Sequence, residues 1–178
     1  MRNLRIEIND NHYQKDFSVN EDTNFIFLIQ KNIDTKIRFD VYKNVNIKVK
    51  VLSTSDNDSE LEIEARLHEN NINYDLRSLA LIDNHSRKSN LIITIPRGAM
   101  GCVASEKEEA FLLDNTAKND ATVAVFSNEK DSAISHSYVC NKIAKRELLL
   151  LASRGINKQQ AQKLLLDTKM KNFIVNDF

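Results

Sequence analysis

Apolar and polar residues alternate strictly along several stretches of the chain. Residues 45–51 alternate Val or Ile with Asn or Lys, and residues 61–67 alternate Leu, Ile or Ala with charged residues. Residues 91–95 and 123–125 carry shorter versions of the same pattern. A period of two with one apolar set is typical of a half-buried β-strand. We therefore predict strands over these four ranges.

Other segments favour strands without a clean alternation. Asn24–Gln30 is apolar on both faces, which predicts a strand covered on both sides. Leu79 and Leu81 fit another strand, and a segment near residue 110 fits a further one. The predicted strands recur roughly every 13–17 residues, which indicates a sandwich, a barrel or a solenoid. Residues 1–40 also read as extended strands, and we expect them to cap the open end of a solenoid.

The connections between the strands help to choose among these architectures. Two-residue hairpins favour Asn-Gly, Asp-Gly or Gly-Gly, and the chain contains none of these pairs among its three glycines. The connections predicted at Ser53–Ser59 and Asp83–Ser89 are polar and longer. A stacked β-solenoid fits this pattern better than a meander, although longer hairpin loops remain an alternative.

The pattern becomes helical near Asn141. Residues 142–154 lack β-alternation and contain good helix formers. Gly155 is placed to end this helix in the left-handed conformation, with Ile156 returning to Leu151 in a Schellman motif. A helical unit over 142–178 therefore follows a β body over 1–141.

A second helix is predicted directly after Gly155. Asn157 is its expected N-cap, and Gln160 follows three residues later, as in a capping box. Ala161, Leu164 and Leu165 recur at helical spacing on one face.

Composition and charge exclude several functions. Twenty-five basic and 25 acidic residues give a net charge of zero, which argues against a general nucleic-acid binder. The chain has neither GxxxxGK[ST] nor GxGxxG, so no nucleotide-binding loop is predicted. No apolar stretch is long enough to span a membrane, the N-terminal residues show no signal core, and two cysteines make no disulfide scaffold. These features predict a cytoplasmic protein.

Residues 136–165 resemble the C-terminal signature of the SufB/SufD family, the scaffold components of the Suf iron–sulfur cluster assembly machine. The likeness rests on His136, on Ser153-Arg154-Gly155-Ile156 that ends the first helix, and on Asn157–Leu165 that follows. It extends more weakly over roughly residues 60–170. The D-type component is the closer likeness, because Ser137 stands where B-type scaffolds carry a Glu.

The resemblance implies a right-handed parallel β-helix with a short C-terminal helical unit, here without the family's N-terminal helical domain. It implies a scaffold subunit rather than an enzyme, with no nucleotide bound by this chain. The helices would dock an ABC-type ATPase, SufC. The β-helix would pair with a SufB-like subunit or with a second copy, and a transient iron–sulfur cluster would form near that pairing interface.

Three residues are candidate cluster ligands on this basis. His136 matches the functional histidine of the family, and a neutral imidazole binds iron well when a second group orients it. Asp131 lies in the right stretch to orient it. Cys102 and Cys140 are the only thiols, and clusters favour thiolate ligands, so a cluster would be shared across subunits. The alternative is that both cysteines are small buried apolar residues.

The helical unit holds the candidate partner-binding residues. Leu148–Leu151 covers more of the helix circumference than one buried face needs, which favours an interface. Residues 141–178 carry eight basic and three acidic residues, so the polar members are either simply solvated or meet an acidic partner. Helix termination alone is the alternative explanation for Arg154 and Gly155. The residues assigned to partner binding are Arg146, Glu147, Leu149, Arg154, Gly155, Ile156 and Lys163.

Two other functions compete with the scaffold. The first is a β-solenoid interaction or structural module without iron–sulfur chemistry. The second is a β-helix enzyme that acts on polysaccharides, which the missing export signal disfavours.

Overall fold

The computed structural model describes residues 1–30, 34–55, 57–143 and 145–175. Strands make up most of this part of the chain, and two helices follow them. The elements are β1 (Arg2–Ile8), β2 (His12–Val19), β3 (Thr23–Gln30), β4 (Asp34–Val41), β5 (Asn46–Ser55), β6 (Ser59–Leu67), β7 (Asn73–Ile82), β8 (Ser86–Ile95), β9 (Val103–Leu112), β10 (Lys118–Ser127), β11 (Ala133–Lys142), α1 (Lys145–Ala152) and α2 (Lys158–Val175).

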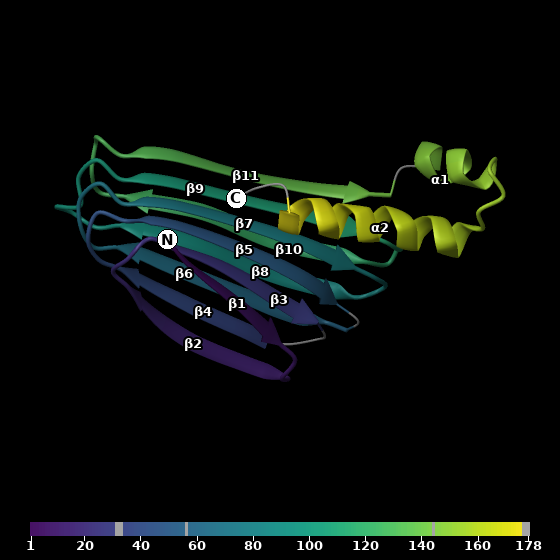
Figure 1. Cartoon of the computed structure of the whole chain (residues 1–178), viewed down its shortest axis with the longest axis horizontal. Coiled ribbons are helices and arrows are strands. Elements are labelled where there is room, and N and C mark those ends of the chain that lie inside the picture. Colours follow the sequence, from purple (N-terminus) through teal and green to yellow (C-terminus); the bar gives the residue numbers. More distant parts are fainter. Residues whose placement is uncertain (31–33, 56, 144, 176–178) are drawn as a thin grey trace.

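Successive strands alternate between two parallel sheets. The odd-numbered strands form a six-stranded sheet in the order β1-β3-β5-β7-β9-β11, and the even-numbered strands form a five-stranded sheet in the order β2-β4-β6-β8-β10. Each turn of the chain thus adds one strand to each sheet and stacks on the turn before it (Figure 1). This arrangement confirms the predicted parallel β-helix and excludes a meander, whose neighbouring strands would be antiparallel.

The turns of the β-helix lengthen along the chain. In the six-stranded sheet Arg2 lies opposite Thr23 at the start of the first turn, whereas Val103 lies opposite Ala133 at the start of the last one. The separation in sequence between such partners is therefore larger at the C-terminal end. The strands lengthen with the turns, from 7 residues in β1 to 10 residues in β9.

The interior changes character along the same axis. Its N-terminal half is packed with aromatic rings, among which Phe39 lies 5.1 Å from Phe25 and 6.0 Å from Tyr74 between ring centroids. Aliphatic side chains from both sheets complete this core. In the C-terminal half, Arg87, Glu106 and Glu108 are buried instead. The two halves therefore differ in chemistry although the backbone pattern is the same.

Two expectations about the strands need correction. The described residues among 1–40 do not form a separate cap, because they build the first turns of the β-helix in β1 to β4. The connections predicted at Ser53–Ser59 and Asp83–Ser89 are also shorter than expected, since β5 continues to Ser55 and β8 begins at Ser86. Pairing with the neighbouring turns satisfies the backbone of these polar residues, so they remain in strands.

The helical unit begins where the sheet ends. The first helix, predicted over 142–154, spans only Lys145–Ala152 because β11 continues through Lys142. The longer helix α2 lies along the outer face of the six-stranded sheet, and α1 extends beyond the end of the sheets (Figure 1). Of the helices described, neither has the length and apolar character needed to cross a membrane.

Candidate functional site

The C-terminal end of the β-helix is open. β11 and β10 are the last strands of their sheets, so each has one free edge. Every residue of β11 except Asn141 is exposed, including Ile134, Tyr138 and Val139. Phe126 on β10 is also exposed, by 59%. A long edge strand with apolar side chains on both faces is a site for pairing with another chain.

His136 and Cys140 lie on the interior-facing side of β11. His136 is paired in register with Glu106 on β9, and Cys140 is paired with Ala110, and both of these β9 residues are buried. Side chains in register on neighbouring strands point to the same face. The inner face of the sheet is covered at β9. The same face is exposed at β11, because no described strand follows β10 in the five-stranded sheet to cover it.

A buried ion pair lies one strand inside the open end. The Arg87 guanidinium binds the Glu108 carboxylate, and both side chains are almost fully buried. Ser89 Oγ lies 2.7 Å from Glu108 Oε2 and donates to this carboxylate, and Asn119 Oδ1 accepts from Arg87 at 3.1 Å. These partners of Glu108 come from within the β-helix, so this charge is satisfied.

Tyr138 connects this network to the surface. Asn119 Nδ2 donates to the Tyr138 hydroxyl at 3.1 Å. Partial burial raises the pKa of Tyr138, and the neighbouring Cys140 and Glu108 add to the rise. A chain of polar contacts thus runs from Glu108 through Asn119 to the side chains at the open end.

Glu106 differs from Glu108 in lacking a side-chain partner among the described residues. Its side chain is 1% exposed, and no described side chain donates a hydrogen bond to either carboxylate oxygen. Burial raises the pKa of Glu106 to about 8; the backbone of Ala124 on β10 offsets part of this rise, and the nearby Glu108 adds to it. The hydroxyl of Tyr74 is likewise buried without a partner in this part of the chain, and the Glu106 charge adds to the rise that burial causes in its pKa.

The three predicted ligands are not brought together. His136 and Cys140 share a face but are four residues apart, about 13 Å on an extended strand. Cys102 is buried in the core, where its thiol donates to the Glu69 carbonyl at 3.2 Å and burial raises its pKa. Within the described residues, no group of three His, Cys, Asp or Glu side chains is placed to hold a metal ion. A cluster at this end would therefore need ligands from a second chain.

Asp131, the group expected to orient His136, has another contact in the structure. Asp131 accepts a hydrogen bond from the backbone amide of Gly101 at 2.9 Å and so fixes a turn. The carboxylate in register with His136 is Glu106, which lies one turn of the β-helix earlier. The orienting role expected of Asp131 stays a prediction.

The connection between the helices follows the predicted capping geometry. Gly155 has φ +80°, and its amide donates to the Ala152 carbonyl at 3.0 Å. The Ile156 amide donates to the Leu151 carbonyl at 3.1 Å, which completes a Schellman motif. Asn157 Oδ1 accepts from the Gln160 amide at 2.9 Å and caps α2. This turn fixes the direction of α2 relative to α1.

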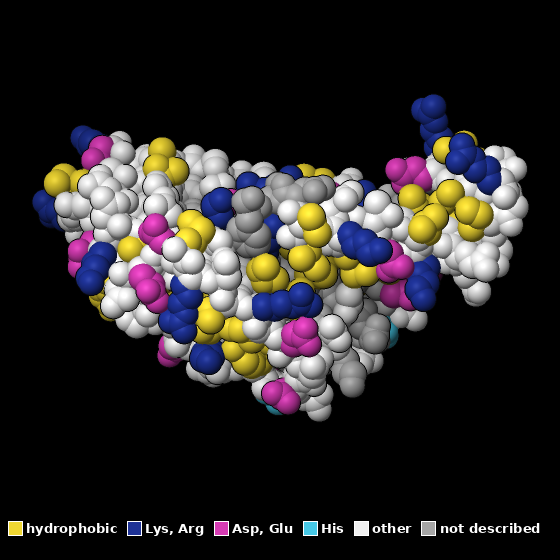
Figure 2. Space-filling view, in the orientation of Figure 1, with side chains coloured by type: hydrophobic (Ala, Val, Ile, Leu, Met, Phe, Trp, Pro, Cys, Tyr) yellow, Lys and Arg dark blue, Asp and Glu magenta, His cyan; other side chains and the backbone are white. Residues whose placement is uncertain are grey.

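α1 presents leucines to solvent. Leu149 is 69% exposed and Leu150 is 57% exposed, while Leu148 and Leu151 are half-buried. Leu164 on α2 is 50% exposed. Arg146, Glu147 and Arg154 are exposed around these leucines, and Figure 2 shows the apolar side chains of this lobe beside basic and acidic ones. Of the candidate partner-binding residues, Ile156 alone is half-buried.

α2 is firmly attached to the sheet. Leu166, Met170 and Phe173 pack on an apolar stripe of the six-stranded sheet that comprises Leu28, Leu52, Leu79, Leu81 and Phe111. The Lys169 ammonium lies 4.3 Å from the centroid of the Phe111 ring. α2 is therefore part of the folded body, whereas α1 packs chiefly on α2.

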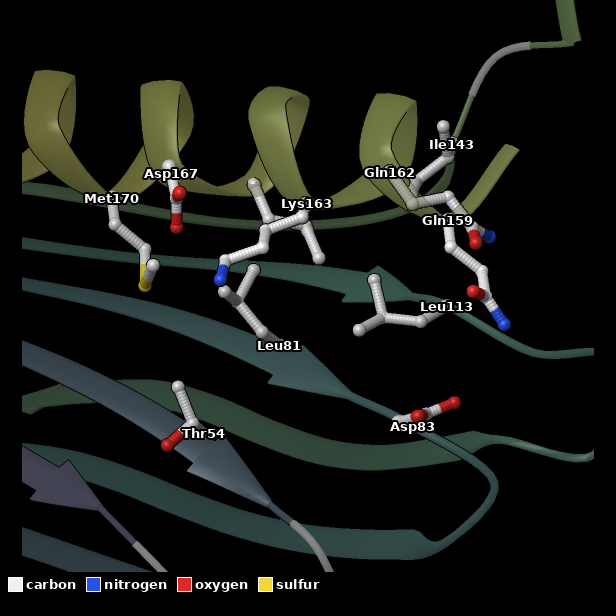
Figure 3. A pocket seen from close by; sticks show the side chains of 11 residues that line it. Thr54, Leu81, Asp83, Leu113, Ile143, Gln159, Gln162, Lys163, Asp167 and Met170 are labelled. Atoms are coloured by element: carbon white, nitrogen blue, oxygen red, sulfur yellow. The ribbon is translucent and has the colours of Figure 1, made fainter. Parts of the chain in front are cut away.

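A groove runs along one side of α2. It has a volume of about 370 Å³ near Leu81, Leu113 and Ile143, and it continues past Met170 toward Leu28. Lys163 and Asp167 extend from α2 toward the sheet in this groove (Figure 3). Lys163 is thus separated from the exposed leucines of α1 and lies on the groove side of the helical unit.

Sequence reasoning missed Glu106 and the charged network around Glu108. In β9 the apolar residues of the alternating pattern are Ala104 and Ala110. Glu106 and Glu108 lie at even spacing between them, so both glutamates point to the same inner face as the alanines. Two alanines are a weak signal, and the glutamates between them read as a solvated face. The even spacing from Ala104 to Ala110 was nevertheless visible in the sequence and could have assigned both glutamates to the inner face.

The structure is a parallel β-helix with a helical unit at its C-terminal end. Residues 88–168 match the family model described as "SUF system FeS cluster assembly, SufBD core domain". This part of the chain is therefore similar to the core domain of the SufB/SufD family. The matched residues include β9 to β11, α1 and most of α2, and so contain every candidate site residue.

Curated proteins show the same relationship. Proteins of Mycobacterium tuberculosis, Mycobacterium bovis and Mycobacterium leprae, each named iron–sulfur cluster assembly SufBD family protein, are 27% identical to the chain over 75 residues. The match covers 42% of this chain and 9% of each relative. The chain therefore corresponds to a small part of these relatives.

Proposed function

We propose that the chain is a SufD-like scaffold subunit of the Suf iron–sulfur cluster assembly complex. On this proposal the helical unit docks an ABC-type ATPase of the SufC kind, and the open end of the β-helix pairs with a SufB-like subunit or with a second copy. The chain binds no nucleotide and catalyses no reaction itself. It works in the cytoplasm as a support on which partners build a cluster.

The exposed leucines of α1 carry the proposal. Burying an apolar side chain contributes about 1.5–3 kcal/mol, yet Leu149 and Leu150 stay in solvent although α2 beside them is packed on the sheet. Such a patch on a small helical lobe fits a protein partner. Charged side chains around it, including Arg146 and Glu147, supply the polar rim that interfaces have.

The open end supports the pairing step. β11 offers a free backbone edge and exposed apolar side chains, which a strand of another chain covers by extending the sheet. His136 and Cys140 then lie at the junction of two chains. Since one chain supplies too few ligands for a cluster, the partner or the substrate ions must supply the rest.

The test is co-expression with the SufC-type ATPase of the same organism, followed by size-exclusion chromatography. We expect the wild-type chain to co-elute with the ATPase and the double variant Leu149→Glu/Leu150→Glu to elute alone. Point substitutions are preferable to a chain ending at Asn141, because removing α2 would uncover Leu79, Leu81 and the rest of the apolar stripe. A wild-type chain that stays alone would contradict the docking proposal.

The second candidate is an interaction module without iron–sulfur chemistry. It is favoured by the burial of Cys102 and by the distance between His136 and Cys140. Iron and sulfide analysis of the assembled complex separates the two. ATPase binding without any iron or sulfide would select the module.

A further inference from the structure

The N-terminal end of the β-helix also has free strand edges. Among the described strands, β1 and β2 are the first of their sheets, so each has one unpaired edge (Figure 1). The half-buried apolar side chains that pack against the aromatic core at this end are Leu4, Ile6, Tyr13 and Phe17. Incompletely covered apolar side chains beside a free edge favour pairing with another chain.

One charged residue interrupts this apolar end. Lys15 lies on the inward-facing side of β2, two residues from Tyr13 and two from Phe17. It begins a row of side chains that are in register across all five strands of its sheet and so share one face. The other members of the row are Ile37, Ile63, Leu91 and Val123. The first three of these are fully buried. An apolar residue at position 15 would complete the row, so the lysine needs an explanation.

The lysine does little harm to the chain on its own. Lys15 is exposed, and its ammonium group lies 5.2 Å from the centroid of the Phe17 ring. A side chain of this kind rests its methylene groups on apolar surface and keeps its charge in water. The charge becomes unfavourable only when another chain covers this end and removes the water. Lys15 thus opposes association without opposing folding.

We propose that Lys15 prevents the N-terminal end of the β-helix from pairing with a second copy of the chain. A copy that stacked its C-terminal end here, with the row continued, would place its Val123 on Lys15 and bury the ammonium group between two apolar side chains. Two N-terminal ends that faced one another would bring two ammonium groups into one interior, where like charges repel. Both arrangements leave a buried charge without a partner, which is strongly unfavourable.

The C-terminal end has no comparable lysine in the middle of its last described strands. The inward positions there are Val123 and Val125 on β10 and Tyr138 on β11. Lys142 is in the inward-facing set of β11, but it is the last residue of the strand and donates to Asn115 Oδ1 at 3.4 Å. An inward-pointing charge is a common means of protecting an edge strand. The β-helix is therefore protected in this way at its N-terminal end only, within the part of the chain that is described.

The test measures self-association of the purified full-length chain by sedimentation velocity over a range of concentrations. We expect Lys15→Leu to associate with a dissociation constant at least about tenfold below that of the wild-type chain. Gln14→Leu is the matched control, because Gln14 is exposed on the outer face of the same strand. It adds the same apolar side chain and should associate as the wild-type chain does. Lys15→Arg keeps the charge and should also match the wild-type chain.

Amide hydrogen exchange shows where the new contact forms. In Lys15→Leu, the amides of β1 and β2 should become protected as the concentration rises. Lys15→Thr, which removes the charge and keeps a good strand former, should change in the same direction, so the result does not depend on one variant folding. Unchanged association and exchange in these variants would overturn the inference, as would equal association of Gln14→Leu. ATPase co-elution is tested at α1, so the proposed function is judged separately.

Discussion

The ammonium group of Lys50, on β5, lies 2.9 Å from the main-chain carbonyl of Phe173 in the last turn of α2. It also lies 3.3 Å from the carbonyl of Ile174. Carbonyls at a helix C-terminus lack partners within the helix and carry partial negative charge. A buried lysine of the sheet thus caps the last helix of the chain.

Replacing Lys50 by methionine should release the end of α2. The change keeps the apolar stem and removes the charged donor, and hydrogen bonds to charged groups contribute about 1.5–3 kcal/mol. We expect the free energy of unfolding in urea to fall by this amount and amide exchange to accelerate over residues 169–175. Lys107→Met, on the exposed outer face of β9, is the control and should leave both unchanged.

Replacing Leu149 by glutamate should abolish partner binding without unfolding the chain. Leu149 is 69% exposed, so the free energy of unfolding should change by no more than about 0.5 kcal/mol. Co-elution with the ATPase measures the binding, and thermal unfolding measures stability. Leu166→Glu, in the face of α2 that packs on the sheet, should instead lower the melting temperature. Loss of folding in Leu149→Glu would show that this leucine is a core residue.

Glu106 should make the stability of the chain depend on pH. Burial raises its pKa from 4.5 to about 8. Between these values the folded chain holds a proton that the unfolded chain has released, so the contribution of Glu106 to stability decreases as pH rises through this window.

Urea unfolding at several pH values tests this dependence. Glu106→Gln should show a flatter profile than wild type between about pH 5 and pH 8, with the largest gain over wild type at the alkaline end. Parallel profiles for the two proteins would mean that Glu106 is ionised in the folded chain at all these pH values.

His136→Ala should leave folding intact and lower the iron and sulfide content of the assembled complex. The side chain is exposed on an edge strand, so its removal uncovers no core. His12→Ala, at the opposite end of the β-helix on β2, is the control. Equal iron and sulfide in the His136→Ala complex would remove this residue from cluster chemistry.

Local patterns predicted much of the fold. The alternation over 45–51 and 61–67 lies within β5 and β6 or directly beside them, and the Schellman motif around Gly155 is formed as expected. These features depend on residues within a few positions of one another. The alternation did not reveal β11, because polar residues occupy both of its faces.

The candidate site was predicted only in part. The resemblance identified His136, but Glu106, its neighbour in register, lies one full turn of the β-helix earlier, and the length of such turns varies along the chain. No local rule gives this register. Lys50 is likewise 123 residues from Phe173, so a lysine in an alternating strand reads as a solvated residue until the helix is placed over it.

The lengthening of the turns, from the one that joins Arg2 to Thr23 to the one that joins Val103 to Ala133, gives the β-helix a taper. Its two ends therefore have cross-sections of different size. A narrow end stacked on a wide end would leave part of the wide interior uncovered, so head-to-tail association, which builds open filaments, is disfavoured. Two wide ends match one another across a two-fold axis, and such a contact closes after two chains. On the proposed pairing of two copies, the taper would favour pairs over polymers and would place the two His136 side chains at the same junction.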